Sequence, residues 1–553
     1  MDRIWVKNYH QGVPTEIDVN SYQSLIEMLE NSCAKYGDKP AFSNFGSRMS
    51  FTELEEKSRY FATYLQQVLK LSKGDRIALM MPDILQYPVG LFGAMRAGII
   101  VVNINPLYTS AELVHILNDA NIQTILIMAN FAHTLEQALP LTQVKQVIVT
   151  EIGDLFPRPK AWLANFFVKY IKKMVPKWSI DGAISFNTVL QEGKKRTFTH
   201  IELTHQDIAF LQYTGGTTGI TKAAILTQRN MVANVLQLVA WVTPVLAPNT
   251  DQVIVTALPL YHIFSLTVNC LTFTMLGGLN VLITNPRDFS HFIKEIKRLK
   301  FTAISGVNTL FNAMVNYPKF KYTDFSHLRF TIGGGMAVQK SVAEKWQQIT
   351  GCMLIEGYGL TEAAPVVTAN PLNANHFTGS IGLPLPSTDI SIRDDKGSEM
   401  AIGEAGELCV KGPQVMPGYW QNPSETQNAF TADGWLRTGD IARIDENGFV
   451  FLVDRKKDMI IVSGFNVYPN EIEEVIGRHP GVLEVAVVGV PDGHSGEIVK
   501  AFIVKKDPNL TKEAIITLCQ KSLTRYKIPK VIEFCNDLPK TSVGKILRRA
   551  LRE

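Results

Sequence analysis

Apolar residues in this chain follow two alternating patterns: short runs rich in β-branched residues, and longer segments with helical spacing. The short runs recur over most of the chain, at residues 76–80, 99–104, 124–128, 146–150, 253–257 and 280–283. Strands that alternate with helices in this way build βαβ units, and such units form largely parallel sheets. The pattern therefore predicts an α/β fold with a large N-terminal body of parallel-type sheets and helices.

The pattern changes after about residue 376, where short apolar runs lie between Gly and Pro residues. We expect strands here at residues 389–393, 406–411, 440–444 and 449–453. Short strands at close spacing are typical of small all-β units. Residues 377–454 are therefore predicted to form a small β-rich, barrel-like section of the body.

A run of charged residues, Asp454-Arg-Lys-Lys-Asp458, follows and is typical of a linker. Beyond it, the pattern predicts the elements of a compact α+β unit, with helices at 471–476 and 512–523 and strands at 482–490 and 501–505. We therefore divide the chain into a body at 1–454, a hinge at 455–458 and a mobile C-terminal lid at 459–553.

Residues 263–283 carry no charge and are long enough to span a bilayer. However, Gly277 and Gly278 interrupt the segment, and residues 279–283 have the composition of a strand. We therefore expect a buried helix followed by a buried strand. Residues 1–10 contain no apolar core of a cleaved signal, so we expect none.

The amino-acid composition is that of a globular protein. Among the 553 residues, 46% are hydrophobic and 19% charged, which excludes a disordered, collagenous or coiled-coil chain. Lys and Arg number 55 against 51 Asp and Glu, so the net charge of +4 gives no electrostatic reason to expect nucleic acid as a partner. The six cysteines are dispersed without a CxxC pair, which argues against a zinc site or a disulfide scaffold and fits the cytosol.

Most of the surplus positive charge lies in two short segments. Residues 155–180 contain six basic and no acidic side chains, and residues 540–553 contain five basic side chains and one acidic. In the first segment one side of a helix would carry Trp162, Leu163, Phe166, Phe167, Tyr170, Ile171 and Met174, and the other side would carry Asn165, Lys169, Lys172 and Lys173. This amphipathic pattern predicts contact with an anionic membrane. The alternative is a helix whose apolar side packs on the body.

The segment Tyr213-Thr-Gly-Gly-Thr-Thr-Gly-Ile-Thr-Lys-Ala-Ala224 carries the strongest chemical signal. Its glycines let the backbone turn tightly, and its backbone N–H groups, hydroxyls and Lys222 suit phosphate oxygens. A Walker A loop is disfavoured because Ile220 and Thr221 separate Gly219 from the lysine. Taken alone, an ordinary Gly-rich turn remains the alternative.

Further motifs follow this loop in order: Glu356-Gly-Tyr-Gly-Leu-Thr-Glu362, Arg437-Thr-Gly-Asp440, Asp454-Arg-Lys-Lys-Asp458 and Pro539-Lys-Thr-Ser-Val-Gly-Lys545. Together they resemble the adenylate-forming superfamily of acyl-CoA synthetases, luciferases and adenylation domains. Three segments are most similar to bacterial long-chain fatty acid–CoA ligases: Asp433 to Ile441 with Gly448 to Lys457, Leu211 to Gly216, and Pro259 to Phe264. Thr221, Ala223 and Gln228 depart from the usual loop pattern without removing a charge.

The resemblance implies an enzyme, a ligase that activates a fatty acid in two steps. The carboxylate first attacks ATP, which gives acyl-AMP and pyrophosphate, and the CoA thiol then displaces AMP to give acyl-CoA. The implied cofactor is Mg²⁺, with ATP and CoA as co-substrates, and the product would enter fatty acid degradation or lipid synthesis. We expect a cytoplasmic protein at the inner face of the cell membrane, with no nucleic acid partner, and leave a homodimer open.

The resemblance also assigns roles to residues. Lys545 would catalyse the first step, Glu362 and Thr214 would hold Mg²⁺, and His262 is a candidate for acyl gating or the second step, or an ordinary buried histidine. The nucleotide-binding set comprises Tyr213, Thr214, Gly215, Gly216, Thr217, Thr218, Gly219, Lys222, Gly334, Gly335, Glu356, Gly357, Tyr358, Gly359, Thr361, Asp440 and Arg455. The hinge and CoA-binding set comprises Lys457, Ser463, Gly464 and Phe465.

Two other functions remain as alternatives. A fatty-acyl-AMP ligase would pass the acyl group to a carrier protein, and retention of the loop around Gly464 favours CoA instead. A lipid-binding or import-coupling protein with a vestigial site would be expected to lose Lys545, Glu362 or Asp440. All of these residues are present.

Overall fold

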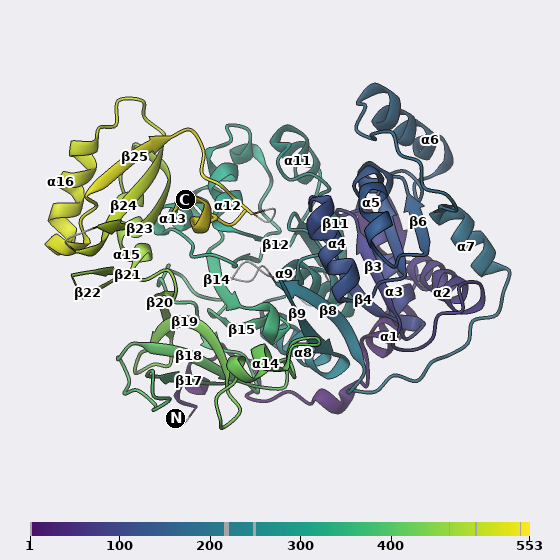
Figure 1. The fold of residues 1–553 in the computed structure, drawn as a ribbon, viewed down its shortest axis with the longest axis horizontal. Helices are drawn as coiled ribbons and strands as arrows, with labels where there is room; N and C mark the ends of the chain where they lie inside the picture. The colour runs from purple at the N-terminus through teal and green to yellow at the C-terminus, as the bar shows by residue number, and fades with distance from the viewer. Residues whose placement is uncertain are drawn as a thin grey trace.

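The computed structural model describes residues 3–214, 221–246, 250–463, 465–492, 495–541 and 544–552. Their strands form four sheets. Figure 1 shows a large body that contains three of the sheets and a smaller C-terminal lobe that contains the fourth. The predicted α/β class of the body and the α+β composition of the small lobe are confirmed.

The first sheet of the body has seven strands in the order β7-β6-β5-β3-β4-β8-β9. They are β3 (Arg76–Met80), β4 (Ile100–Asn103), β5 (Thr124–Met128), β6 (Gln146–Thr150), β7 (Ile184–Ser185), β8 (Ile208–Thr214) and β9 (Lys222–Thr227). All neighbours are parallel except β8 and β9, which are antiparallel. The predicted βαβ pattern is therefore confirmed for this sheet.

The second sheet has nine strands in the order β16-β15-β14-β13-β12-β10-β11-β1-β2. They are β1 (Pro40–Asn44), β2 (Ser47–Ser50), β10 (Val253–Thr256), β11 (Leu279–Leu282), β12 (Ala303–Gly306), β13 (Phe330–Gly333), β14 (Leu354–Gly359), β15 (Val366–Ala369) and β16 (Leu383–Pro384). Its centre is parallel, and antiparallel pairs close both edges. The carboxyl ends of the parallel strands therefore share one edge, where ligand sites of such sheets form.

Helices cover these two sheets (Figure 1). The longer ones are α1 (Leu25–Tyr36), α2 (Phe51–Gln67), α3 (Gln86–Arg96), α4 (Ser110–Asp119), α5 (Ala132–Ala138), α7 (Phe186–Lys194), α8 (Gln228–Val242), α11 (Phe289–Ile296), α12 (Asn308–Asn316) and α13 (Lys340–Thr350). Ser50 and Thr109 begin α2 and α4 with complete capping boxes, which satisfy N–H groups that the helix leaves free. The local sequence thus determines where these helices begin.

The β-rich section forms a four-stranded antiparallel sheet. Its strands are β17 (Asp389–Arg393), β18 (Gly406–Lys411), β19 (Leu436–Ile444) and β20 (Val450–Arg455), and the short helix α14 (Pro423–Ala429) lies between β18 and β19 in the chain. The first two strands have the predicted bounds. We expected a barrel-like section; the described strands have the open order β17-β18-β19-β20, with β17 and β20 at its edges.

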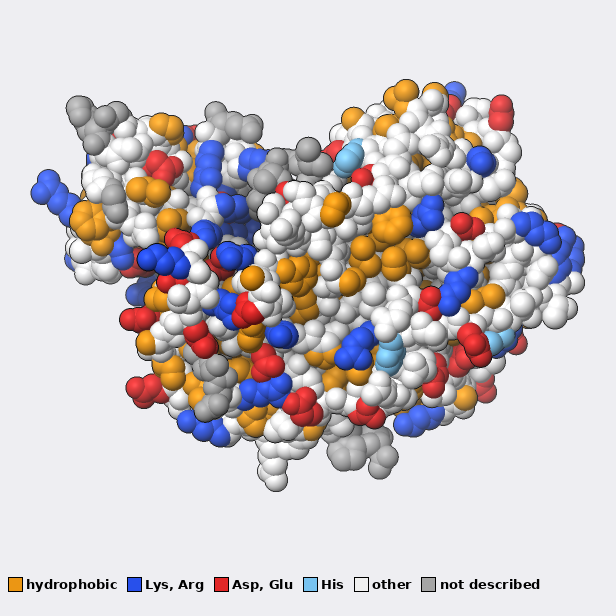
Figure 2. Space-filling model, turned by 60° about the horizontal axis from the view of Figure 1, so that its bottom comes forward, with side chains coloured by type: hydrophobic (Ala, Val, Ile, Leu, Met, Phe, Trp, Pro, Cys, Tyr) orange, Lys and Arg blue, Asp and Glu red, His pale blue; other side chains and the backbone are white. Residues whose placement is uncertain are grey.

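The small lobe contains the five-stranded sheet. Its strands are β21 (Ile460–Val462), β22 (Phe465–Val467), β23 (Val482–Asp492), β24 (Gly496–Lys505) and β25 (Val531–Cys535), and its helices are α15 (Pro469–Gly477) and α16 (Lys512–Ser522). The two predicted helices and the strand at 482–490 are confirmed within two residues. The strand predicted at 501–505 begins at Gly496, and β21, β22 and β25 had not been predicted. On the face shown in Figure 2, Lys and Arg side chains gather in the recess beside this lobe.

Residues 263–283 form a buried helix and then a buried strand, as predicted. The helix consists of α9 (Ile263–Ser265), a π-helical turn η7 (Leu266–Leu271) and α10 (Thr272–Met275), and β11 follows it. Every residue of η7 is buried inside the body. Within the described part of the chain, no helix combines the length and apolar character that a bilayer crossing requires.

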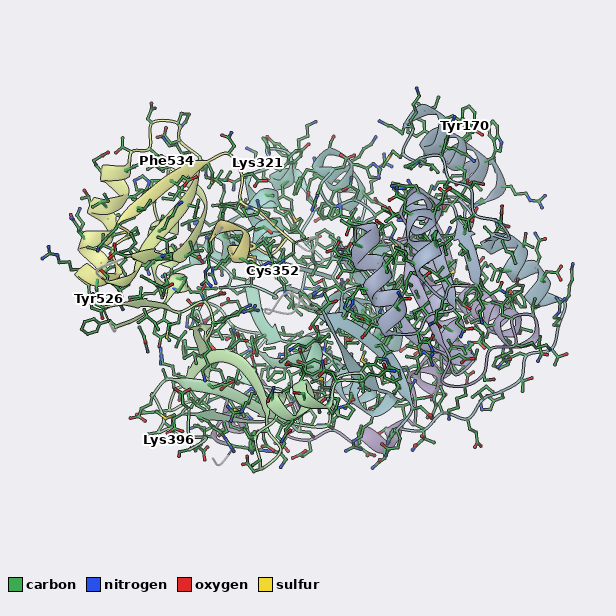
Figure 3. All side chains as sticks on the ribbon, viewed as in Figure 1. Tyr170, Lys321, Cys352, Lys396, Tyr526 and Phe534 are labelled. Atoms are coloured by element: carbon green, nitrogen blue, oxygen red, sulfur yellow. The ribbon has the colours of Figure 1, made fainter. Side chains whose placement is uncertain are left out.

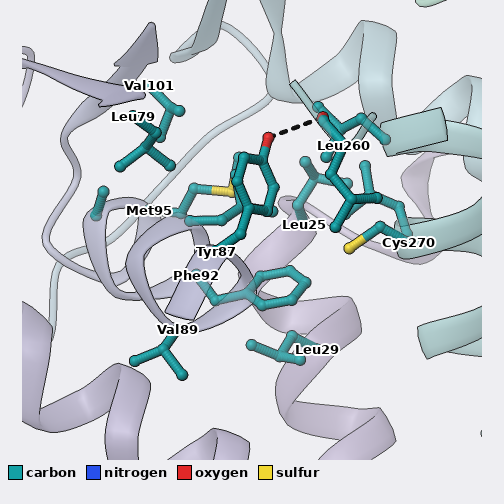
Figure 4. Packing of buried hydrophobic residues seen from close by; sticks show 14 of the residues in the cluster. Leu25, Leu29, Leu79, Tyr87, Val89, Phe92, Met95, Val101, Leu260 and Cys270 are labelled. Carbon is teal, nitrogen blue, oxygen red and sulfur yellow. Dashed lines mark hydrogen bonds between the residues drawn. The ribbon is translucent and has the colours of Figure 1, made fainter. Parts of the chain in front are cut away.

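A buried polar network joins the two large sheets just before α9. The Asp83 carboxylate accepts the Leu260 N–H at 2.7 Å, and Gln212 Nε2 donates to the Tyr261 carbonyl at 2.9 Å. The Tyr87 hydroxyl lies 2.9 Å from the Leu260 carbonyl, amid packed side chains that include Leu25, Phe92 and Cys270 (Figure 4). Because polar groups in an apolar core are costly unless paired, these bonds specify the position of the segment that leads to His262.

Candidate active site

The candidate site lies where the two large sheets, the β-rich section and the small lobe meet. Lys545 reaches it from the C-terminal tail, and the other groups come from the carboxyl ends of strands in the body. A pocket here is lined by Leu258, His262, Phe264, Val307, Gly335 and Lys545. The structure thus brings together residues that lie more than 280 positions apart in the chain.

Backbone contacts on both sides of a turn hold Lys545 in place. The Thr541 N–H donates to the Lys545 carbonyl at 2.7 Å, and the Lys545 N–H donates to Thr541 Oγ1 at 3.1 Å. Thr309 on α12 donates its hydroxyl to the Gly544 carbonyl at 2.9 Å, which fixes the turn to the body. The small lobe is therefore docked with its lysine inside the site.

Several charged groups act on the Lys545 ammonium. Burial, reinforced by Arg455, lowers the pKa of Lys545 to about 8, while Asp440 and Glu362 act in the opposite direction. The lysine is therefore a cation at neutral pH but close to its titration midpoint. A partly desolvated cation of this kind interacts strongly with anionic substrate groups.

Gly335 makes room for this lysine. It follows β13 with φ +76°, and a Cβ built on it would lie 2.9 Å from Lys545 Cε. The resemblance predicted Gly334 and Gly335 only as nucleotide-binding residues. The structure shows that Gly335 also permits the close approach of Lys545.

His262 caps the helix that begins at Ile263. Its Nδ1 accepts the Phe264 N–H at 3.3 Å, which places the ring proton of a neutral imidazole on Nε2. Burial, together with the charge of Lys545, lowers the pKa of His262 to about 3. The imidazole is therefore neutral at physiological pH and presents a donor, Nε2–H, with no free basic nitrogen.

Tyr358, Asp440 and Arg455 form a chain of contacts opposite this pocket. The Tyr358 hydroxyl donates to Asp440 Oδ2 at 2.5 Å, and Arg455 Nε lies 3.4 Å from Asp440 Oδ1. Burial raises the pKa of Asp440, and the neighbouring Arg455 and the Tyr358 hydroxyl oppose that shift. Asp440 and Arg455 face each other across the β19–β20 ladder, so the sheet register sets their separation.

The remaining predicted residues of the 356–362 motif differ in environment. Burial raises the pKa of Glu356 to about 8, and its Oε1 accepts the Val338 N–H at 2.9 Å, so this side chain stabilises the turn after Gly335. Gly357 and Gly359 lie on β14, where a Cβ on Gly359 would lie 2.2 Å from the Pro365 carbonyl oxygen. Thr361 begins the short 3₁₀ helix η9 (Thr361–Ala363), which carries Glu362.

Glu362 lies beside a tyrosine that the sequence analysis missed. The Tyr419 hydroxyl donates to Glu362 Oε1 at 2.8 Å. Lys222 pairs with Glu425 of α14, and its ammonium lies 5.5 Å from the centre of the Tyr419 ring. Tyr419 and Glu425 carry no motif in the sequence, because only the fold places them opposite the predicted residues.

Tyr213 and Thr214 end β8, and Thr214 pairs with Lys222 across the ladder to β9. The Tyr213 hydroxyl donates to Asp119 at the end of α4, at 2.5 Å. The predicted phosphate-binding residues Gly215, Gly216, Thr217, Thr218 and Gly219 lie outside the described residues. Gln228, an unusual residue in the loop pattern, accepts the Leu25 N–H at 2.9 Å and so begins α1.

The predicted hinge and CoA-binding residues are not gathered around Lys545. Lys457 is exposed between β20 and β21, and Arg552 lies near its carbonyl, at 3.5 Å. The Ser463 N–H donates to Ser495, Gly464 lies outside the described residues, and the Phe465 ring stacks on Tyr526 at 4.8 Å. Figures 1 and 3 place β22 and Tyr526 at the outer edge of the small lobe. This arrangement brings one face of the lobe to the site and leaves the other in solvent.

The residues present suit a magnesium ion. Mg²⁺ prefers oxygen ligands and is held by one or two carboxylates together with substrate phosphates. Glu362 provides one carboxylate whose Oε2 has no hydrogen-bond partner among the described residues, and η9 packs beside β9. Among the described residues no group of three or more His, Cys, Asp or Glu side chains could hold a metal alone. The donor set therefore fits an ion that arrives with a nucleotide.

Comparison with known proteins agrees with this geometry. Residues 29–420 match the family described as AMP-binding enzyme, and residues 471–545 match the AMP-binding enzyme C-terminal domain. A long-chain-fatty-acid–CoA ligase of Yersinia pestis is 58% identical over 553 residues, which cover 100% of this chain and 98% of that protein. A ligase of the same name from Bacillus subtilis is 37% identical and covers 99% of this chain and 97% of its own length.

Solved structures match over nearly the full length as well. The anthranilate CoA ligase AuaEII in complex with anthranoyl-AMP matches with a TM-score of 0.85 and 25% identity, over 97% of this chain and 98% of that chain. ATP-bound MatB from Rhodopseudomonas palustris matches with a TM-score of 0.78 and 28% identity, over 95% of this chain and 98% of that chain. The likeness includes the small lobe as well as the body.

Proposed function

The chain belongs to the AMP-binding enzyme family, and from this premise we propose that it is a long-chain fatty acid–CoA ligase. It activates the fatty acid with ATP, releases pyrophosphate, and transfers the acyl group from acyl-AMP to the thiol of CoA. The observation that carries this proposal is the position of Lys545 inside a pocket that also contains His262, with Asp440, Arg455 and Glu362 acting on its charge.

In the first step the Lys545 ammonium lies between the fatty acid carboxylate and the α-phosphate. It reduces the repulsion between these two anions and stabilises the charge that grows on the phosphate oxygens. Asp440 accepts hydrogen bonds from the ribose hydroxyls, and the Tyr358 ring supports the adenine. Lys222 and the glycine-rich loop at residues 215–219 bind the β- and γ-phosphates. Glu362 and Thr214 would hold Mg²⁺, which would neutralise charge on the triphosphate.

The second step requires a different face of the small lobe. Rotation about residues 455–458 withdraws Lys545 and brings the loop of Ser463, Gly464 and Phe465 to the site, where it lines the path of the CoA arm. Hinges of this kind concentrate the change of backbone angles in a few residues. Under this scheme residues 1–454 act as the body and residues 459–553 as the lid. His262, with its proton on Nε2, donates a hydrogen bond to the acyl carboxylate or carbonyl.

An assay that omits one substrate at a time tests the proposal. Pyrophosphate release is measured with palmitate, ATP and CoA, and then with each left out. A CoA ligase forms pyrophosphate once without CoA and turns over only with it. Turnover with a carrier protein but not with CoA would indicate a fatty-acyl-AMP ligase. Binding of palmitate without any pyrophosphate would indicate a lipid-binding protein and overturn the proposal.

A membrane-binding surface accompanies this function in our proposal. The helix α6 (Arg158–Phe166), the π-helical turn η5 (Phe167–Ile171) and the three residues after it form an arm, residues 158–174. Its apolar side chains are exposed by 40–66%: Trp162, Leu163, Phe166, Phe167, Tyr170, Ile171 and Met174. Figure 3 places Tyr170 at the outer edge of the molecule. The opposite side of the arm attaches to the body, because Asn165 Oδ1 accepts the Gly153 N–H at 2.7 Å. The apolar side therefore faces solvent rather than the body.

The positive charge of this arm favours an anionic lipid surface as its binding partner. A contiguous exposed apolar patch usually marks an interaction site, and the six basic residues at 155–180 without an acidic one complement an anionic lipid surface. A long-chain fatty acid partitions into bilayers, so docking there delivers the substrate. The protein then works at the inner face of the cell membrane. A homodimer stays a prediction, which light scattering of the purified chain would test.

A further inference from the structure

Tyr419 lies between two groups that the proposed function assigns to the triphosphate. Its hydroxyl donates to Glu362 Oε1 at 2.8 Å, and its ring lies beside Lys222, whose ammonium is 5.5 Å from the ring centre. One side chain thus contacts the carboxylate that suits Mg²⁺ and the cation that suits phosphate. Neither the loop motif nor the 356–362 motif includes this residue.

The backbone of Tyr419 is fixed against the strand that carries Lys222. Trp420 N–H donates to the Ala223 carbonyl at 2.8 Å, and Ile225 N–H donates to the Gly418 carbonyl at 3.0 Å. The Tyr419 N–H itself donates to Thr426 Oγ1 at 2.9 Å. Residues 418–420 therefore extend the edge of the seven-stranded sheet beyond β9, and the tyrosine has little freedom to move away from the lysine.

The carboxylate is fixed from the same segment. Met416 N–H donates to the backbone carbonyl of Glu362 at 2.8 Å, so both the backbone and the side chain of Glu362 are held by residues 416–419. With Oε1 occupied, Oε2 is the oxygen left for a cation.

We propose that Tyr419 is a positioning residue, which orients the Glu362 carboxylate toward the Mg²⁺ of the bound nucleotide. This inference rests on the proposed function only for the identity of the nucleotide. Hydrogen-bond partners of metal ligands fix ligand orientation, and their loss typically costs roughly 10- to 100-fold in metal affinity or activity. The hydroxyl makes the contact with Glu362, so a substitution that removes it and keeps the ring tests the proposal.

Tyr419→Phe removes the hydroxyl and keeps the ring. Calorimetry with α,β-methylene ATP, an analogue that cannot be cleaved between the α- and β-phosphates, measures binding with Mg²⁺ and with EDTA. We expect the Kd with Mg²⁺ to rise about 10-fold, while the Kd in EDTA and the Kd for AMP stay within about 2-fold. Tyr322→Phe, which alters an exposed tyrosine elsewhere, is the matched control.

A double-mutant cycle with Glu362→Gln supplies the second test. If Tyr419 acts through Glu362, adding Tyr419→Phe to Glu362→Gln has no further effect on the Mg²⁺-dependent Kd. Wild-type affinity of Tyr419→Phe with Mg²⁺, an equal loss in EDTA and for AMP, or full additivity in the cycle would each overturn the proposal. These measurements involve neither fatty acid nor CoA. They therefore test the role of Tyr419 whether or not the chain forms acyl-CoA.

Discussion

The side chain of Lys545 packs directly on Gly335, so closely that a Cβ on the glycine would lie 2.9 Å from Lys545 Cε. The two residues come from the lobe and the body, and their contact is possible only when the lobe is docked with Lys545 in the site. The glycine therefore makes room for Lys545, in addition to the nucleotide-binding role that we propose for it.

Gly335→Ala is expected to slow acyl-AMP formation by about 10²-fold, because displacement of a catalytic group by about 1 Å costs this much. Conversion of supplied acyl-AMP to acyl-CoA should be slowed much less, because Lys545 has left the site by then under the proposed rotation. Gly351→Ala is the control, because Gly351 also has a positive φ of +72° but nothing within 4 Å of its Cβ position. Equal losses in both variants would contradict the proposed contact.

The pKa of about 8 for Lys545 predicts the pH dependence of the first step. The residue acts as a cation, so kcat/KM for ATP in acyl-AMP formation should fall about tenfold per pH unit above pH 8 and level off below it. Lys545→Arg keeps its charge through this range. Its residual activity should therefore lack the fall at high pH; the same fall in this variant would assign the titration to another group.

Asp440→Ala should weaken AMP binding by roughly 10- to 150-fold, because hydrogen bonds to a charged group contribute about 1.5–3 kcal/mol. Calorimetry with AMP measures the loss directly. Asp433→Ala removes a carboxylate that pairs with Arg393 nearby in the β-rich section, and it should leave AMP affinity unchanged. Unchanged affinity in Asp440→Ala would remove Asp440 from the ribose site.

Phe465→Ala tests whether the outer face of the lobe serves the second step. Phe465 is 55% exposed and stacks on Tyr526, so the substitution should spare pyrophosphate release without CoA. The KM for CoA should rise, because the ring would line the CoA path after rotation. Val531→Ala, another exposed apolar residue of the lobe, should change neither step. A loss of the first half-reaction in Phe465→Ala would contradict the proposal that this face of the lobe acts only in the second step.

Replacing Lys169, Lys172 and Lys173 with Glu should weaken binding to anionic liposomes by 10²-fold or more, since each lysine near such a surface contributes about 1 kcal/mol. Sedimentation with phosphatidylglycerol-containing liposomes measures it. The same change at Lys396, Lys512 and Lys521, which are exposed elsewhere, controls for net charge. Unchanged sedimentation of the first variant would contradict membrane docking through the arm.

Local patterns predicted much of the fold. The strands at 389–393 and 406–411 have the predicted bounds, because each is a short buried run between segments that contain Gly or Pro residues. The uncharged segment at 263–283 is a buried helix followed by a strand, since Gly277 and Gly278 end the helix in any environment. The motifs likewise predicted Lys545, Asp440 and Glu362 as chemically important positions.

The sequence by itself determined many of the elements and the family, and it predicted the candidate site residues, because each depends on neighbours within a few positions or on a motif. Only the tertiary structure decided that Gly335 makes room for Lys545, that Tyr419 holds Glu362 and that the arm at 158–174 turns its apolar side to solvent. These relationships join residues far apart in the chain, and helical periodicity is the same whether a face meets solvent or protein. Such contacts depend on how the sheets and the lobe pack, which a local pattern cannot express.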